Sequence, residues 1–253
     1  MQTCLNSYER IRKILKIKET ENIKKGTDIK LLNGNIEFNQ VCMNYGDKEV
    51  LKDVSFMIQQ GQKVTIVGRT GVGKTTLTGL LMRLYETTSG TILIDGNDIK
   101  ELTIECIRRN ISYISQTPYI FKDTIRNNIT LGSKEIEDKD ILELIENLGA
   151  DKILNNLKDG LDTQIIASRL SGGELQIIAF LRAILHKTNI YIFDEPTANL
   201  DFKTEKMIQN IIDTIAKTST VIVIAHRKST IEKSDKVIYL KDGKVDKIDN
   251  KVS

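Results

Sequence analysis

Proline and cysteine are scarce in this chain of 253 residues, which contains only two prolines and three cysteines. The cysteines, Cys4, Cys42 and Cys106, lack the paired spacing of a zinc site or a redox couple, and this favours a reducing compartment. No run of eighteen apolar residues is present, and charged residues stand near the start, where a signal peptide needs an apolar stretch. We therefore expect a globular protein that does not itself span a membrane.

An excess of charge of either sign is absent as well. The 37 basic and 34 acidic residues leave a formal net charge of +3, and the two signs are interspersed along the chain. Proteins that bind nucleic acids typically gather basic residues on one face or in one stretch. We therefore expect no nucleic acid among the partners.

The first thirty residues differ in composition from the rest, because lysines stand there among Ile11, Ile14, Leu15 and Ile17. This spacing predicts a short amphipathic helix followed by a polar linker that ends near Gly26. Two interpretations stay open: a solvated helix face with one apolar stripe, or an element that lies close to a membrane. We treat residues 1–30 as a separate segment and residues 31–253 as the main domain.

Two kinds of strand pattern occur in the main domain. Alternation of apolar and polar residues over 34–45, 49–61 and 90–96 predicts antiparallel strands. Short continuous apolar runs are typical of strands buried on both faces of a parallel sheet. Such runs cover residues 63–68, 189–194 and 220–225.

Helical spacing dominates the block between about 117 and 187, where apolar residues recur three and four apart. Near the end, Asp242-Gly243 lies between two alternating runs and predicts a hairpin. The expected fold is α/β: a parallel-sheet core with an N-terminal antiparallel β subdomain and an inserted α-helical subdomain.

A glycine-rich turn joins the first buried run to a helical pattern over residues 74–85. Gly68, Gly73, Lys74 and Thr75 match the spacing G-x-x-x-x-G-K-[ST] of a phosphate-binding loop. Glycines let backbone N–H groups curl around an anion, and the helix N-terminus adds partial positive charge. Lys74 would reach the outer phosphates, and the Thr75 hydroxyl would ligate Mg²⁺. The glycines would also suit a plain turn, but the four fixed positions, with the flanking strand and helix, favour nucleotide binding.

The other two buried runs end in groups that suit the same chemistry. Asp194 and Glu195 end one run, and His226 follows the next. Side chains at the carboxyl ends of parallel strands meet where ligands of α/β folds bind. We expect Asp194 to hold Mg²⁺ and Glu195 to polarise an attacking water. Alone, two acids or one histidine would be structural, but the phosphate loop favours a site.

With the segment LSGGE at residues 170–174, these residues resemble the nucleotide-binding domain of an ATP-binding cassette (ABC) transporter over about residues 35–245. The resemblance implies an ATPase of the P-loop NTPase fold that powers transport across a membrane. It also implies that Tyr45 stacks on adenine and that Gln116 links the nucleotide site to the helical subdomain.

A composite site is a further implication of the resemblance. Two such domains pair head to tail, so that Ser171, Gly172 and Gly173 of one contact the γ-phosphate held by Lys74 of the other. Asp201 communicates across that interface. The expected partners are a second ABC ATPase domain, in a homodimer, and a transmembrane permease domain or subunit, at the cytoplasmic face of the cell membrane.

The expected site falls into three groups of residues. The catalytic group is Glu195, His226 and Gln116, and the metal group is Thr75, Gln116 and Asp194. The nucleotide-binding group is Tyr45, Gly68, Arg69, Thr70, Gly71, Val72, Gly73, Lys74, Thr75, Thr76, Ser171, Gly172, Gly173 and Asp201.

Residues 114–129 and 7–19 are similar to the exporter branch of the family, in which a last transmembrane helix continues through a basic linker into this domain. We expect either a domain separated from its membrane part or an ATPase that meets a separate permease.

Three features depart from the family pattern. Glu174 replaces a commoner glutamine, Leu175 replaces a polar residue, and the segment 162–170 is shorter than in exporters. The first two predict lower turnover, and the third bears on coupling to transport. Two alternatives stay open: a regulatory module that holds ATP with little hydrolysis, and a soluble ABC ATPase without a transport role.

Overall fold

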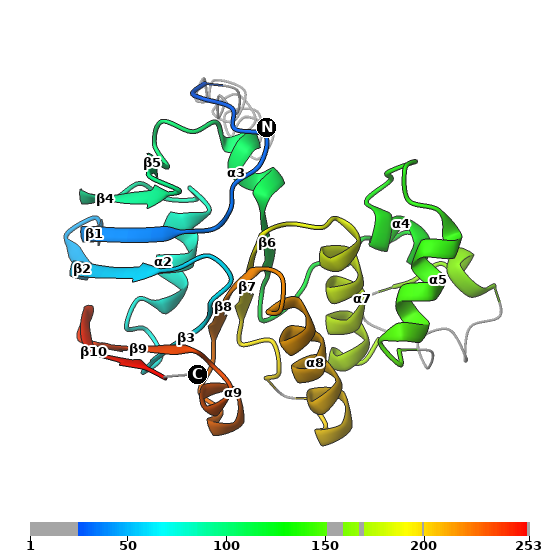
Figure 1. The fold of residues 1–253 in the computed structure, drawn as a ribbon. Helices are drawn as coiled ribbons and strands as arrows, with labels where there is room; N and C mark the ends of the chain where they lie inside the picture. The colour runs from blue at the N-terminus through cyan, green and yellow to red at the C-terminus, as the bar shows by residue number, and fades with distance from the viewer. Residues whose placement is uncertain (1–24, 151–158, 167–169, 199, 252–253) are drawn as a thin grey trace, which may run out of the picture.

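The computed structural model describes residues 25–150, 159–166, 170–198 and 200–251, which form two sheets with helices beside them (Figure 1). The strands are β1 Ile36–Tyr45, β2 Lys48–Ile58, β3 Lys63–Gly68, β4 Ser89–Ile94, β5 Asn97–Asp98, β6 Ile111–Ile114, β7 Ile190–Asp194, β8 Thr220–Ile224, β9 Lys236–Lys241 and β10 Lys244–Asn250. The helices are α2 Lys74–Leu81, α3 Ile104–Asn110, α4 Ile125–Thr130, α5 Asp138–Asn147, the 3₁₀ helix η1 Gly160–Asp162, α7 Gly172–Leu185, α8 Phe202–Ile215 and α9 Lys228–Glu232.

An antiparallel sheet in the order β2-β1-β4-β5 contains the three strands predicted from alternation. Ile36 of β1 lies opposite Ile58 of β2 and Ile94 of β4, and all three are fully buried. Because side chains alternate across a strand, one face of this sheet packs on the core while the other remains polar.

The second sheet has the order β10-β9-β3-β8-β7-β6 and is parallel except for the β9–β10 hairpin, which was also predicted. Every residue of β7 and β8 is buried, as their continuous apolar runs indicate. Ile224, at the end of β8, lies opposite Ile66 of β3 on one side and Asp194 of β7 on the other. The carboxyl ends of these three strands therefore meet at one edge of the sheet.

The helical block lies on the far side of this sheet from the antiparallel strands (Figure 1). Its longest helix, α7, is buried on two sides. Phe180 packs with Phe193 of β7, whereas Ile178 and Leu181 join the apolar side chains of α4 and α5 in a separate cluster. Thus α7 connects the inserted helices to the sheet that carries the strand ends.

The predicted α/β architecture is confirmed, with local corrections. The helix expected over residues 74–85 ends at Leu81, because Arg83 adopts a left-handed backbone conformation with φ of 50°. The short strand β6 and helix α3 were not predicted. The division at residue 31 stays a prediction, and the amphipathic helix expected near the start lies mostly within residues 1–24, outside the described residues. No helix in the described part of the chain is sufficiently long and apolar to cross a membrane.

Candidate functional site

The phosphate loop, residues 68–75, joins β3 to α2 and needs its glycines for two reasons. Gly71 and Gly73 have positive φ angles of 80° and 108°, which favour glycine. A Cβ atom on Gly73 would lie 2.6 Å from Leu51 Cδ2, and one on Gly68 would lie 2.6 Å from the Leu240 carbonyl oxygen. No side chain caps α2 at Gly73, so its first N–H groups remain available to an anion.

Lys74 turns back over this loop, and its ammonium group is held by the loop's own carbonyl groups. Its Nζ donates to the carbonyl oxygens of Gly68, at 2.6 Å, and Arg69, at 3.1 Å. Only 6% of the residue is exposed. Burial lowers the pKa of Lys74, against the opposing influence of Glu195 and Asp194. The ammonium group is therefore preorganised for an anion that enters the loop.

A cavity of about 880 Å³ opens beside the phosphate loop. Its wall includes residues 68–72 of the loop, His226, Leu240 of β9 and Lys48 of β2. It is therefore bounded by both sheets, and it has the volume of a site for a nucleotide-sized molecule.

Asp194 and Thr75 meet at the end of β7. Thr75 Oγ1 donates to Asp194 Oδ2 at 3.0 Å, and the phenol of Tyr113 donates to the same oxygen at 3.3 Å. Burial raises the pKa of Asp194, while the hydrogen bonds from Thr75 and Tyr113 act in the opposite direction. A carboxylate beside a hydroxyl is an oxygen donor set that suits Mg²⁺, so the predicted metal residues Thr75 and Asp194 fit this ion.

Glu195 lies between two further predicted residues. His226 Nε2 is 3.2 Å from Glu195 Oε1, and Gln116 Nε2 donates to Glu195 Oε2 at 3.4 Å. The backbone of Glu195 is in the left-handed region, with φ of 46°, and its N–H donates to the Ile224 carbonyl at 2.9 Å. Such strained conformations concentrate at functional sites. The structure thus brings together the three residues predicted as catalytic.

Tyr45 stands at the edge of this site, near the start of α2. The residue is 42% exposed, and its ring contacts Tyr85 edge-on, with centroids 5.3 Å apart. Its hydroxyl lies 3.5 Å from Thr76 Oγ1. A half-exposed ring at this place is available to stack on a base, as predicted, but its role stays a prediction.

The signature segment, residues 170–174, is separate from this site. Ser171 is the N-cap of α7: its Oγ accepts from the Glu174 N–H at 3.3 Å. Glu174 Oε2 in turn accepts from the N–H and the hydroxyl of Ser171, both at 2.7 Å, which completes a capping box. Asp201 caps α8 next to it and accepts from Thr204 Oγ1 at 2.6 Å. Within the described residues, no hydrogen bond or ion pair joins the signature segment to the phosphate loop.

Two contacts near the site were not predicted. Tyr113 lies in the unpredicted strand β6, three residues before Gln116. Gln176 of α7 donates through Nε2 to the Gln116 carbonyl oxygen at 2.9 Å, which ties α7 to the residue beside Glu195. Both contacts depend on long-range packing that no local pattern describes.

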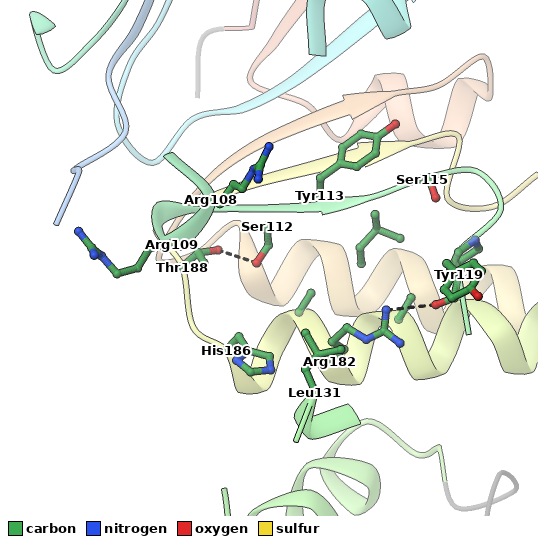
Figure 2. Close-up of a pocket in the computed structure, with 14 residues that line it drawn as sticks. Arg108, Arg109, Ser112, Tyr113, Ser115, Tyr119, Leu131, Arg182, His186 and Thr188 are labelled. Atoms are coloured by element: carbon green, nitrogen blue, oxygen red, sulfur yellow. Dashed lines mark hydrogen bonds between the residues drawn. The ribbon is translucent and has the colours of Figure 1, made fainter. Parts of the chain in front are cut away.

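A second cavity, of about 510 Å³, is lined by residues of both β6 and α7 and is called here the partner groove (Figure 2). Arg182 crosses it and donates to the carbonyl oxygens of Asn128 and Tyr119, at 2.8 and 3.2 Å. Its Nη2 is buried and has no hydrogen-bond partner in the part of the chain that the structure describes. The groove therefore carries an incompletely satisfied cationic group.

Comparison with known proteins gives consistent results. Residues 51–198 match the family model described as ABC transporter. The chain is 39% identical over 217 residues to the ATP-dependent lipid A-core flippase of Francisella tularensis, covering 85% of this chain and 36% of the flippase. It is 38% identical over 230 residues to ABC transporter B family member 13 of Arabidopsis thaliana, covering 89% of this chain and 18% of that protein.

A solved structure agrees in fold. The structure of a bacterial Atm1-family ABC exporter with ATP bound superposes with a TM-score of 0.87 and 31% sequence identity, over 98% of this chain and 44% of that chain. The chain spans about a third or less of the length of the two curated relatives above.

Proposed function

The chain belongs to the ABC transporter family as an exporter-type ATPase domain, and from that premise we propose that it binds ATP with Mg²⁺ at the phosphate loop and hydrolyses it at Glu195. The observation that carries the proposal is the convergence of Lys74, Asp194 and Glu195 at one sheet edge, beside a cavity bounded by the loop.

Each residue at this edge has a distinct task. The Lys74 ammonium exchanges its two carbonyl partners for phosphate oxygens, and the free N–H groups at the start of α2 bind the same phosphates. Mg²⁺, when bound, neutralises charge on the phosphates, and Thr75 and Asp194 supply the oxygens that would hold it.

Glu195 acts as the base that orients and deprotonates the attacking water. Its carboxylate is fixed from two sides, by His226 on Oε1 and by Gln116 on Oε2. Because a fixed base needs little reorganisation, this arrangement supports hydrolysis rather than simple retention of ATP, which was the alternative of a regulatory module.

The signature segment serves a second copy of the domain. Ser171 and Gly172 are exposed, and they lie at the start of a fourteen-residue helix whose N–H groups favour an anion. Head-to-tail pairing would bring them to the γ-phosphate held by the other copy, with Asp201 beside them. Lack of any contact with the phosphate loop of the same chain supports this use, within the described residues.

The partner groove is where a transmembrane partner would dock. Its rim carries exposed apolar side chains, Tyr119 at 71% and Leu131 at 53%, with Phe121 at 47% close to Tyr119. Clusters of exposed apolar groups mark interaction surfaces. A permease domain bound there would place this domain at the cytoplasmic face of a membrane and couple hydrolysis to export.

The test combines two variants of the full chain. Glu195→Gln keeps size but removes the base, so we expect phosphate release to fall by about 10²–10⁴-fold while ATP binding persists. Slow hydrolysis preserves the bridging phosphate, so light scattering after size exclusion with ATP and Mg²⁺ should show a longer-lived dimer than the parent forms.

Ser171→Arg in the same background is the control, because its side chain fills the space for the partner's phosphate. It should abolish the dimer and leave nucleotide binding intact. Unchanged phosphate release in Glu195→Gln would contradict the role of Glu195. If Glu195→Gln alone binds ATP yet stays monomeric, or if Ser171→Arg leaves its dimer intact, head-to-tail pairing is contradicted.

A further inference from the structure

Tyr113 lies in β6 and is among the residues that line the partner groove, but its ring points to the other side of the strand. Figure 2 shows its ring on the opposite side of the strand from Arg182 and His186, whereas the Ser112 side chain turns toward Thr188. Parallel pairing places Tyr113 opposite Ile192 of β7, two residues before Asp194. The phenol therefore reaches the carboxyl end of β7.

The hydroxyl of Tyr113 contacts the carboxylate that the proposed function assigns to the metal. It donates to Asp194 Oδ2 at 3.3 Å, and Thr75 Oγ1 donates to that same oxygen at 3.0 Å. Among the described residues, no other side chain or backbone group donates a hydrogen bond to this carboxylate, so Oδ1 is free of protein donors. Two donors on one oxygen fix the rotation of the carboxylate and orient the other oxygen.

We propose that Tyr113 is a positioning residue for the divalent cation: its phenol holds Asp194 Oδ2 so that Oδ1 is presented to the ion that Thr75 also serves. The inference rests on the proposed function. It goes beyond the predicted metal set by adding a residue that touches no ligand and acts through Asp194. When Thr75 turns its oxygen toward a cation, Tyr113 remains as the donor that keeps the carboxylate oriented.

A purely structural role for Tyr113 is separable from this one. The ring is partly buried and packs against the core cluster beneath the antiparallel sheet. Tyr113→Phe keeps the ring and its packing and removes only the hydroxyl. Tyr191→Phe is a matched control on the neighbouring strand β7, where the Tyr191 hydroxyl accepts from the Thr188 N–H at 3.1 Å, away from Asp194.

The experiment measures Mn²⁺ binding to the full chain by electron paramagnetic resonance, with the β,γ-imido analogue of ATP present. We expect Tyr113→Phe to bind Mn²⁺ about tenfold more weakly, the scale expected for losing one hydrogen bond to a charged group. Without metal, in the presence of a chelator, Tyr113→Phe should bind the analogue with the affinity of the parent. Its melting temperature should also equal that of the parent. Tyr191→Phe should bind Mn²⁺ like the parent.

Two results would overturn the inference while leaving the proposed function in place: Mn²⁺ affinity of Tyr113→Phe equal to that of the parent, or an equal loss of analogue affinity without metal. If the parent itself binds the analogue no better with Mn²⁺ than without it, the proposed metal site fails, and the role of Tyr113 fails with it.

Discussion

The phosphate loop and the signature segment are both glycine-containing helix starts, but they are stabilised in opposite ways. Around the loop, Lys74 and Asp194 are 6% and 7% exposed, and their environment is built from strands far apart in the sequence. At the signature segment, Ser171 and Glu174 satisfy each other across a single turn. The phosphate-loop side of the site is assembled within one chain, whereas the signature segment is an exposed helix start that is capped locally, as the proposed pairing with a second copy requires.

The largest expected loss of ATP affinity comes from Lys74→Ala, because it removes the positive charge at the centre of the phosphate loop. A hydrogen bond to a charged group contributes about 1.5–3 kcal/mol, so ATP affinity should fall by about 10- to 100-fold or more. Isothermal titration calorimetry measures the loss. Lys139→Ala removes an exposed lysine from helix α5, away from this cavity, and should change affinity little. Parental affinity in Lys74→Ala would remove the phosphate-binding assignment of the loop.

Most features of the phosphate loop and of the signature segment could be predicted from the sequence. The phosphate loop depends on a local pattern, and so do Asp194 at the end of β7 and His226 just after β8, and the structure places them where these patterns predict. Even the capping box is local, because Glu174 stands three residues after Ser171.

What could not be predicted is contact between distant segments. The strand β6 has only four residues at the edge of a sheet, too few for a period to emerge, and its pairing with β7 alone brings Tyr113 to Asp194. Helix α2 also ends earlier than predicted, because the chain turns at Arg83. The turn lets Tyr85 pack against Gly79, where a Cβ atom on the glycine would lie 2.9 Å from the tyrosine ring. Tertiary packing decided these features rather than local propensity.

Tyr45 tests the comparison further, because it is exposed, as the signature segment is, but we assign it to the nucleotide site beside the phosphate loop. Tyr45→Ala should weaken ATP binding by about 1–3 kcal/mol if the ring stacks on adenine. Tyr45→Phe keeps the ring and loses the hydroxyl, which contacts Thr76 Oγ1 and hydrogen-bonds Tyr85, so it should bind ATP nearly as the parent does. Competition titrations with ATP and inorganic triphosphate separate the two causes: an equal loss for both ligands would mean that Tyr45 supports the fold of the loop rather than the base.

The smallest expected effect is at the signature segment. It tests whether the charge of Glu174, which caps α7 locally, opposes pairing with a second copy. Glu174 puts a negative charge in the first turn of α7, where the helix favours it by about 0.3–1 kcal/mol. The same charge would repel the phosphates of a second copy. Glu174→Gln keeps a side-chain oxygen for the Ser171 N–H but removes the charge, so the monomer should lose a few tenths of a kcal/mol of unfolding free energy.

Pairing should respond in the opposite direction. In the Glu195→Gln background with ATP and Mg²⁺, we expect Glu174→Gln to tighten the dimer by about 0.5–1 kcal/mol, the scale of a half-exposed charge interaction, as measured by sedimentation equilibrium. Because salt screens exposed charges, the gain should shrink as ionic strength rises.

Glu143→Gln, on helix α5, is the control, because it removes an exposed charge outside the signature segment and should leave the dimer dissociation constant unchanged. A dimer that weakens in Glu174→Gln, or a gain that is insensitive to salt, would mean that Glu174 supports the interface through its hydrogen bonds to Ser171 and does not compete with the incoming phosphate. A salt-sensitive gain would identify the carboxylate as an internal substitute for that phosphate, held at the helix start until a second copy displaces it.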